Sequence, residues 1–489
     1  MDEIKERLSQ IVGKENVLDG LMILESYAKD QSFKRSLRPW FVVKPANADQ
    51  IQELVQWANE TKTPLIPVSS GAPHFNGDTV PSAAGAVIVD LSGMKKILRI
   101  DRRNRVAVIE PGVTYDQLEA ELAKEGLRVT MPLLPRKNKS VVASLLERQP
   151  TVIPRYQYSL TEPLRNCGVI WGNGIKLYTG EAGNGPYNLE DQWKAGMAQV
   201  DPKGPNATDF TKIITGSQGT MGIVFWASVK CEILPDTRKL LIIPADKLED
   251  LIDFSYRTQR LRMGDEVMIV NQAQLANMMG GNAQKISELK QQLPRWIMLM
   301  GVAGRALYAD EKLAVMVQDI IDTAQQFGLN VVTGIPGISS KALLDTILTP
   351  SSENYWKLNY KGGCQDIFFM TPLDKTPQYL KTMYSAADAL GFCSNDIGIY
   401  IQPQHQGAVY HCEFNLPYDP SNKKETEKVQ ALYEKVSREL AAQGAYFSRP
   451  YGMWSELVYQ RDLDSTTTLR KLKKIFDPNN VMNPGKLCF

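Results

Sequence analysis

Histidine and cysteine are scarce in this sequence, and their scarcity argues against most metal chemistry. The 489 residues include only three histidines, at positions 74, 405 and 411. Because a catalytic transition-metal site usually takes two or three ligands from this pool, a multi-histidine metal centre is nearly excluded. The six cysteines lie far apart and form no CxxC pair. This spacing is typical of reduced thiols rather than of a disulfide framework or a zinc site.

An excess of one charge and long apolar runs are also missing. Lys and Arg number 56 against 54 Asp and Glu, so no global basic field favours nucleic acid or an anionic membrane as a partner. No segment approaches the roughly 20 apolar residues of a membrane span, and residues 1–20 lack the apolar core of a signal peptide. We therefore expect a cytoplasmic protein. With 43% hydrophobic residues, the chain is long enough for two well-filled domains.

Strand and helix patterns alternate in the first half of the chain. Residues 49–61 have the apolar spacing of one helix face, and short β-branched segments stand on both sides of them. Residues 41–68 therefore predict a strand, a helix and a strand. The same reasoning predicts strands over 86–91, 97–101 and 106–111, a Thr-capped helix over 114–126, and a hairpin that turns at 173–174.

From about residue 239 the pattern changes, and we expect a second α+β unit. Residues 240–263 predict a strand followed by a helix, and residues 422–445 predict a long helix. The last segment, 466–489, predicts a basic helix closed by a Pro/Asn/Gly turn, which can fold back on the first domain.

The loop PLIPVSSGAPHFNGDTVP, residues 64–81, combines rigidity with close access to the main chain. Its four prolines restrict the backbone, while Gly71 and Gly77 permit positive φ and the close approach of a ligand. Ser69, Ser70 and consecutive backbone N–H groups can then surround an anion. Two interpretations stay open at this point: a pyrophosphate clamp, or an ordinary surface loop.

Three further segments read together with this loop resemble a known flavoprotein family. They are VAVIEPGVTYDQL, IITGSQGTMGIVFWASVKC and FDPNNVMNPGKL, in this order. The family is named after vanillyl-alcohol oxidase and 4-cresol dehydrogenase. The resemblance implies an α+β protein with a PCMH-type FAD-binding domain at 1–238, completed by 460–489, and an α+β cap domain for the substrate at 239–459. It also implies FAD as the cofactor, without the G-x-G-x-x-G fingerprint.

The resemblance assigns a set of residues to FAD. Gly216, Gly219 and Gly222 would let the main chain pass close to the cofactor, and Lys137 and Lys139 replace glycines of the relatives. A lysine near phosphate would be favourable, and a solvated charged run is the equal alternative. The residues expected to bind FAD are Pro67, Ser69, Ser70, Gly71, Ala72, Pro73, His74, Pro135, Ser140, Gly216, Ser217, Gly222, Ile223, Val224 and Lys486.

The segment GAVYHCEFNL supplies two candidate catalytic residues. If it is a strand, alternation places Val409, His411, Glu413 and Asn415 on one face, which would be costly to bury without partners. We expect this face to line a polar cavity, where His411 attaches the flavin covalently or acts as a base. The alternative is the solvent-facing side of an edge strand.

Arg449 stands where the 4-alkylphenol oxidisers of the family have a Tyr-Arg pair that stabilises a phenolate. A guanidinium there would bind a phenolate or a carboxylate. The tyrosine of the pair corresponds to Ser448, and a second phenolate-binding tyrosine corresponds to Asn76, so phenol recognition is not carried over intact. Tyr446 and Tyr451 are possible substitutes.

The acidic residue that these relatives place near the flavin would fall close to Glu162. Nearby, Tyr156 and Tyr158 are candidates for a pocket lining or for core packing.

The function expected from this resemblance is FAD-dependent oxidation in aromatic compound metabolism. Hydride would pass from an aromatic alcohol or para-alkylphenol to flavin N5, and electrons would then pass to an external acceptor such as a cytochrome or an iron–sulfur protein. Oxidation of a 2-hydroxy acid is the second hypothesis, although the histidine-rich cap segment of that branch is absent. A non-catalytic flavin-binding subunit is the third. The state of assembly, as a homo- or hetero-oligomer, stays open.

Overall fold

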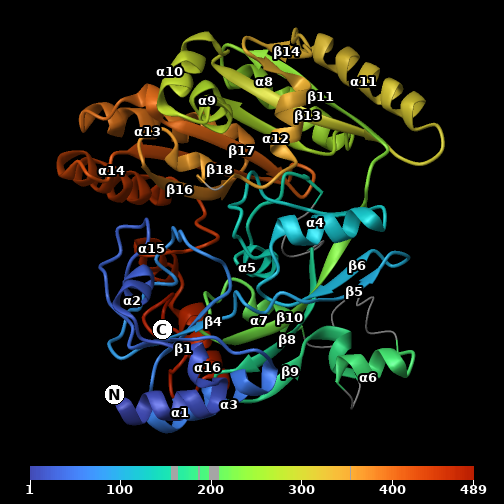
Figure 1. Cartoon of the computed structure of the whole chain (residues 1–489). Helices are drawn as coiled ribbons and strands as arrows, with labels where there is room; N and C mark the ends of the chain where they lie inside the picture. Colours follow the sequence, from blue (N-terminus) through green and yellow to red (C-terminus); the bar gives the residue numbers. More distant parts are fainter. Residues whose placement is uncertain (156–162, 185–187, 198–208, 353) are drawn as a thin grey trace.

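Three large sheets, divided between two lobes, form the framework of the computed structural model (Figure 1). The structure describes residues 1–155, 163–184, 188–197, 209–352 and 354–489. The lower lobe in Figure 1 holds the N-terminal segments and the C-terminus, and the upper lobe holds the middle of the chain.

The first sheet confirms the predicted strand–helix–strand unit. Helix α3 (Ala48–Thr61) begins at Asn47, whose side chain accepts a hydrogen bond from the Gln50 N–H, and it buries its predicted apolar face. The strands on either side of α3 do not pair directly, because β4 lies between them and runs parallel to both. The sheet order is β1 (Val17–Leu18), β2 (Phe41–Val43), β4 (Val87–Asp90) and β3 (Leu65–Val68), with α1 (Asp2–Val12) and α2 (Leu21–Ala28) also in this region.

The second sheet contains the predicted hairpin, whose turn places Gly174 at a φ of 82°. Its path is β5 (Ile97–Asp101), β6 (Val106–Ile109), β10 (Gly222–Ile233), β8 (Leu164–Trp171) and β9 (Lys176–Tyr178), and β7 (Leu127–Val129) pairs with β10. The helices of this part are α4 (Tyr115–Lys124), α5 (Val141–Leu146), α6 (Leu189–Lys194) and α7 (Thr211–Ile214). Thr114 and Gln117 form a capping box at the start of α4, as the Thr-cap prediction requires.

The third sheet forms the upper lobe, which we call the cap. Its order is β11 (Thr237–Ala245), β13 (Trp296–Gly304), β12 (Val267–Asn271), β17 (Gly398–Gln404), β18 (Val409–Tyr418) and β16 (Gly363–Thr371). Its helices are α8 (Glu249–Arg260), α9 (Gln272–Gly280), α10 (Ala283–Gln292), α11 (Ala309–Gln326), α12 (Ser340–Ile347), α13 (Thr376–Ala389) and α14 (Lys423–Ala442). A small hairpin joins β14 (Gly334–Ile335) to β15 (Ile338–Ser339). The apolar side chains of β16, β17 and β18 share one core with those of α8, α13 and α14.

The C-terminal segment returns to the first sheet, as predicted. After α15 (Met453–Tyr459) and α16 (Leu463–Phe476), the Leu65 N–H donates to the Val481 carbonyl at 2.7 Å. The chain therefore closes on β3, the strand at the start of the 64–81 segment. Of the helices that the structure describes, none combines the length and the apolar character that a membrane crossing needs.

Buried polar contacts join the two lobes. Arg128 of β7 forms an ion pair with Glu266 at 2.6 Å, and the Trp356 indole N–H donates to the Leu134 carbonyl at 3.2 Å. The sequence-based limits of the two domains stay a prediction.

Candidate active site

Hydrogen bonds of main-chain and side-chain groups hold the 64–81 loop against residues 135–140. The Gly71 N–H donates to the Asn138 carbonyl at 2.9 Å, and the Ser140 N–H donates to the Ser70 hydroxyl at 3.1 Å. Arg136 donates to the carbonyls of Gly71 and Pro73. A Cβ on Gly71 would lie 2.8 Å from the Asn138 Cβ, so this contact requires glycine.

A second glycine joins this loop to the loop before β10. Gly219 has a φ of 71°, and a Cβ there would lie 2.6 Å from the Pro67 ring. Asn483 ties the same two loops together, because its side-chain amide donates to the Gln218 and Asp78 carbonyls at 2.8 and 3.0 Å. Gln218 in turn donates to the Pro450 carbonyl at 2.9 Å. The two loops and the segment that carries Arg449 therefore form one connected wall.

The loop leaves buried donors without a protein acceptor. Ser70 and His74 are less than 10% exposed, and their main-chain N–H groups donate to no acceptor in the described ranges of the chain. Since unpaired buried N–H groups are costly, this arrangement favours a bound anion. His74 presents a neutral imidazole there, because burial and the nearby Arg136 and Lys139 lower its pKa to about 3.

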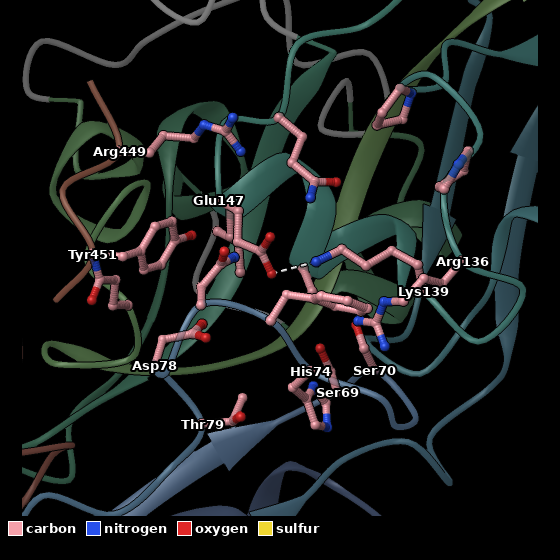
Figure 2. A pocket seen from close by; sticks show the side chains of 18 of the residues that line it. Ser69, Ser70, His74, Asp78, Thr79, Arg136, Lys139, Glu147, Arg449 and Tyr451 are labelled. Atoms are coloured by element: carbon pink, nitrogen blue, oxygen red, sulfur yellow. Dashed lines mark hydrogen bonds and ion pairs between the residues drawn. The ribbon is translucent and has the colours of Figure 1, made fainter. Parts of the chain in front are cut away.

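One continuous cavity extends from this loop to the cap, with about 1730 Å³ of space when its part open to solvent is counted. Figure 2 shows Arg449 and Tyr451 on one side of the cavity and Ser70, His74 and Arg136 on the other. Within it, the ammonium of Lys139 bonds to the Glu147 carboxylate. Residues of the 64–81 loop and residues of the cap therefore line the same cavity.

The cap side of the cavity is the polar face of three neighbouring strands. Strand pairing arranges its side chains in rows across β17, β18 and β16. The rows are Gly398, Asn415 and Asp366; Tyr400, Glu413 and Phe368; and Gln402, His411 and Met370. Asp366, Phe368, Tyr400 and Glu413 line the cavity. The face is buried, and β18 lies between two strands, so the alternative of a solvent-facing edge strand is wrong.

Lys357, from the short helix Trp356–Leu358, is the centre of a buried charged network. Its ammonium lies 2.5 Å from both the Asp366 and the Glu413 carboxylates. Asn415 donates to the same two carboxylates at 2.6 and 2.7 Å, and His411 Nε2 lies 3.0 Å from Glu413 Oε2. We call these five residues the cap network.

Electrostatics within the cap network fix its charges. Burial opposes ionisation, yet Lys357 and the bonded His411 hold the pKa of Glu413 well below its usual range. Burial, followed by Glu413, raises the pKa of Asp366, although Lys357 opposes the shift. Burial also lowers the pKa of His411, in spite of its Glu413 bond. The network thus contains a carboxylate, a lysine ammonium and a neutral imidazole at neutral pH.

Arg449 is the notable cation outside this network. It is 7% exposed and lines the cavity, and its Cζ lies 3.9 Å from the centroid of the Phe368 ring. Its guanidinium forms no ion pair with any residue that the structure describes. A buried guanidinium without a carboxylate is a site prepared for an anion.

The structure brings most of the predicted site residues to this cavity. The expected FAD contacts that line it are Pro67, Ser69, Ser70, His74, Pro135, Gly216, Ser217, Gly222 and Val224, together with the catalytic candidates Arg449 and Glu413. Other described candidates are not part of this lining: Gly71, Ala72, Pro73, Ser140, Ile223 and His411. Glu162, Tyr156 and Tyr158 lie outside the described residues.

Lys486 supports the loop from behind. Its ammonium donates to the carbonyls of Gly77 and Val80, and burial, followed by the charge of Lys34, lowers its pKa to about 7. Of the two lysines that replace glycines, Lys137 is exposed and Lys139 is buried. The alternative of a solvent-exposed charge therefore suits Lys137 and not Lys139.

Sequence reasoning missed Arg136, Lys357, Asp366 and Gln274, all of which line the cavity. Arg136 lies in the same short basic segment as Lys137 and Lys139. The other three come from distant parts of the chain and carry no local pattern that would single them out.

Comparisons with known proteins agree with this geometry. Residues 39–146 match the model of an FAD binding domain, and residues 366–487 match that of the C-terminal domain of FAD linked oxidases. D-2-hydroxyglutarate dehydrogenase of Stutzerimonas stutzeri is 24% identical, with 99% of this chain and 98% of the relative covered. The 4-cresol dehydrogenase flavoprotein subunit of Pseudomonas putida is 23% identical over 92% and 87%. The structure of p-cresol methylhydroxylase with substrate bound superposes with a TM-score of 0.82 at 18% identity, with 100% of this chain and 96% of the other covered.

Replacing Gly71 by alanine tests whether the loop holds FAD. The added Cβ would overlap with Asn138, and overpacking costs roughly 1 to 3 kcal/mol, so we expect FAD affinity to fall about tenfold or more. The measurement is titration of the deflavinated protein with FAD. Gly93→Ala is the matched control, because a Cβ there would meet no atom within 4 Å. Unchanged affinity in both variants would contradict a binding role for the loop.

The residues present fit a flavin dinucleotide. The loop offers unpaired N–H groups and nearby cations to a diphosphate, and the same cavity continues to a substrate pocket in the cap. Once bound, FAD supplies an acceptor for the two electrons and the hydrogen that a substrate loses. Fold, matched domains and relatives agree: the chain is an FAD-linked oxidoreductase with the PCMH-type flavoprotein fold.

Proposed function

We propose that this enzyme oxidises an aromatic alcohol or a para-alkylphenol, and that bound FAD would supply, at flavin N5, the acceptor for the hydride of the substrate carbon. An external redox partner would then take the electrons. The observation that carries the proposal is the Arg449 guanidinium, which lies over the Phe368 ring and forms no ion pair with a described residue, in a cavity also lined by Tyr400 and Tyr451. This combination suits a flat ring that carries an oxyanion.

The chain's own residues have distinct parts in this proposal. Arg449 holds the oxyanion, and the aromatic side chains orient the ring. Glu413 lines the cavity as a carboxylate bonded to Lys357, which suits it to accept a hydrogen bond from the substrate rather than to act as a base. His411 acts on Glu413 through the 3.0 Å contact as a positioning residue. Of the possible substitute tyrosines, Tyr451 is 5% exposed and lines the cavity, whereas Tyr446 is 56% exposed.

The sequence left covalent flavin attachment through His411 open beside a role as a base, and we propose that FAD is held without this covalent bond. Its Nε2 already contacts Glu413, and its side chain is not part of the cavity lining. We therefore expect acid precipitation to release the FAD into a yellow supernatant, and a yellow pellet would contradict this.

A 2-hydroxy acid is the second candidate substrate. A carboxylate would suit Arg449, and the Stutzerimonas relative is named for a 2-hydroxy acid. The segment 395–416 lacks the histidine-rich pattern expected of that branch, so we place this candidate second.

Anaerobic reduction of the bound flavin tests the proposal. The holoenzyme is mixed with para-alkylphenols, benzylic alcohols and 2-hydroxy acids, and loss of the yellow colour is followed. Fastest bleaching by an aromatic substrate is the expected result, while bleaching by hydroxy acids alone would favour the second candidate. A flavin that no compound of the three classes bleaches would favour the non-catalytic subunit hypothesis.

A further inference from the structure

The cavity is also lined by a buried side-chain amide that has no hydrogen-bond partner among the described residues. Gln274, on the first turn of helix α9, has 0% exposure and lines the cavity. Neither its amide nitrogen nor its amide oxygen has a hydrogen-bond partner in the part of the chain that the structure describes. Because an unsatisfied buried amide is costly, both atoms need a partner from within the cavity.

The fold places this amide at a defined site on the cap sheet. A Cβ on Gly398 would lie 2.4 Å from Gln274 Oε1, so the glutamine side chain occupies the space that this glycine leaves free. Asn415 beside Gly398 donates both of its amide hydrogens to carboxylates, and its Oδ1 accepts no hydrogen bond from Gln274 or any other described residue. The Gln274 side chain therefore has a fixed place in the fold, but the described neighbouring groups leave its Nε2 and Oε1 without hydrogen bonds.

The strand register gives the separation between Gln274 and Arg449. Gly398 lies under Gln274, and Phe368 lies under Arg449. Two strand-to-strand steps and one two-residue step along the strands separate Gly398 from Phe368, which is roughly 12 Å between their Cα atoms. The two polar groups therefore stand on the order of 10 Å apart in one cavity.

We propose that Gln274 is a specificity-determining residue that binds an uncharged hydroxyl or amide at the opposite end of the substrate from the oxyanion held by Arg449. The inference rests on the proposed function and narrows its substrate class. The substrate is an aromatic alcohol or phenol with a second hydrogen-bonding group across the ring, and is longer than a simple cresol. A primary amide both donates and accepts, which matches a hydroxyl in either orientation.

Anaerobic calorimetric titration of the holoenzyme with a pair of ligands tests this assignment. The ligands are 4-phenylphenol and 4,4′-dihydroxybiphenyl, which have no oxidisable alkyl carbon and differ by one hydroxyl at the end away from the first phenol. We expect the dihydroxy compound to bind about 5- to 10-fold more tightly, as one neutral hydrogen bond to a buried group allows. Gln274→Leu should abolish the difference. Asn277→Leu is the matched control on the same helix, because Asn277 is also buried with an unpartnered oxygen but does not line the cavity.

The outcomes separate this inference from the proposed function. If both phenols bind through Arg449 but equally well, the Gln274 assignment is wrong and the oxyanion site stands. If Asn277→Leu removes the preference as fully as Gln274→Leu does, the effect belongs to the fold of α9 and the assignment also fails. If neither phenol binds and Arg449→Ala changes nothing in flavin reduction, the proposed function itself is wrong.

Discussion

Replacing Arg449 by alanine is expected to slow flavin reduction by the preferred substrate by at least about 30-fold and to leave the FAD content unchanged. Loss of one partner of a buried charge pair costs about 2 to 5 kcal/mol, and here the missing partner would be the substrate anion. The guanidinium forms no ion pair with a carboxylate among the described residues, so its removal leaves none of these carboxylates without its partner. Stopped-flow reduction under anaerobic conditions measures the rate, and absorbance of the purified protein measures the FAD.

Two further variants make this prediction specific. Arg449→Lys keeps a positive charge but loses the planar fork and much of the stacking on Phe368, so we expect an intermediate rate. Arg438→Ala changes an exposed arginine of α14 and should leave reduction unaffected. Parallel loss of FAD content and reduction rate in Arg449→Ala would show that the arginine has a structural role instead.

Local patterns allowed much of the FAD-binding lobe to be predicted. Helix α3, the capped helix α4 and the hairpin at Gly174 follow from caps, apolar spacing and turn residues within a few positions of each other. The alternation of β18 also placed His411 and Glu413 on one face correctly. What the sequence left open was whether that face met solvent or a cavity, because the answer depends on which strands lie beside it.

The rest of the site depends on contacts between distant positions. Lys357 becomes the partner of Glu413 only because β16 and β18 pair and a short helix returns over them, and 56 residues separate the two side chains. Similarly, Arg136 points into the cavity because Gly71 lies against Asn138, which no local pattern in the basic run indicates. Tertiary packing determines such contacts, and local sequence patterns do not predict it.

Replacing Lys357 by methionine is expected to destabilise the protein by about 3 to 5 kcal/mol, since removing one partner of a buried ion pair leaves uncompensated charge. Asp366 and Glu413 would then face each other with only Asn415 between them. Chemical unfolding in urea at neutral pH measures the loss. Lys361→Met is the matched control: this lysine also contacts two carboxylates, Asp396 and Glu425, but it is 27% exposed, so its loss should cost about 1 kcal/mol or less.

The stability lost in the Lys357→Met variant should depend on pH, and the direction of this dependence can be predicted. Without the ammonium, burial and mutual repulsion would raise the folded-state pKa of one of the two carboxyls above its unfolded value of about 4. The folded state would then bind the extra proton more tightly, so stability would fall as pH rises from about 4 through that raised pKa. The deficit against wild type should therefore be larger at pH 8 than at pH 5. Adding Glu413→Gln removes one of the two charges and should recover part of the stability at pH 8. A deficit that is the same at both pH values, and that the second substitution does not reduce, would mean that Lys357 stabilises the cap through packing rather than charge.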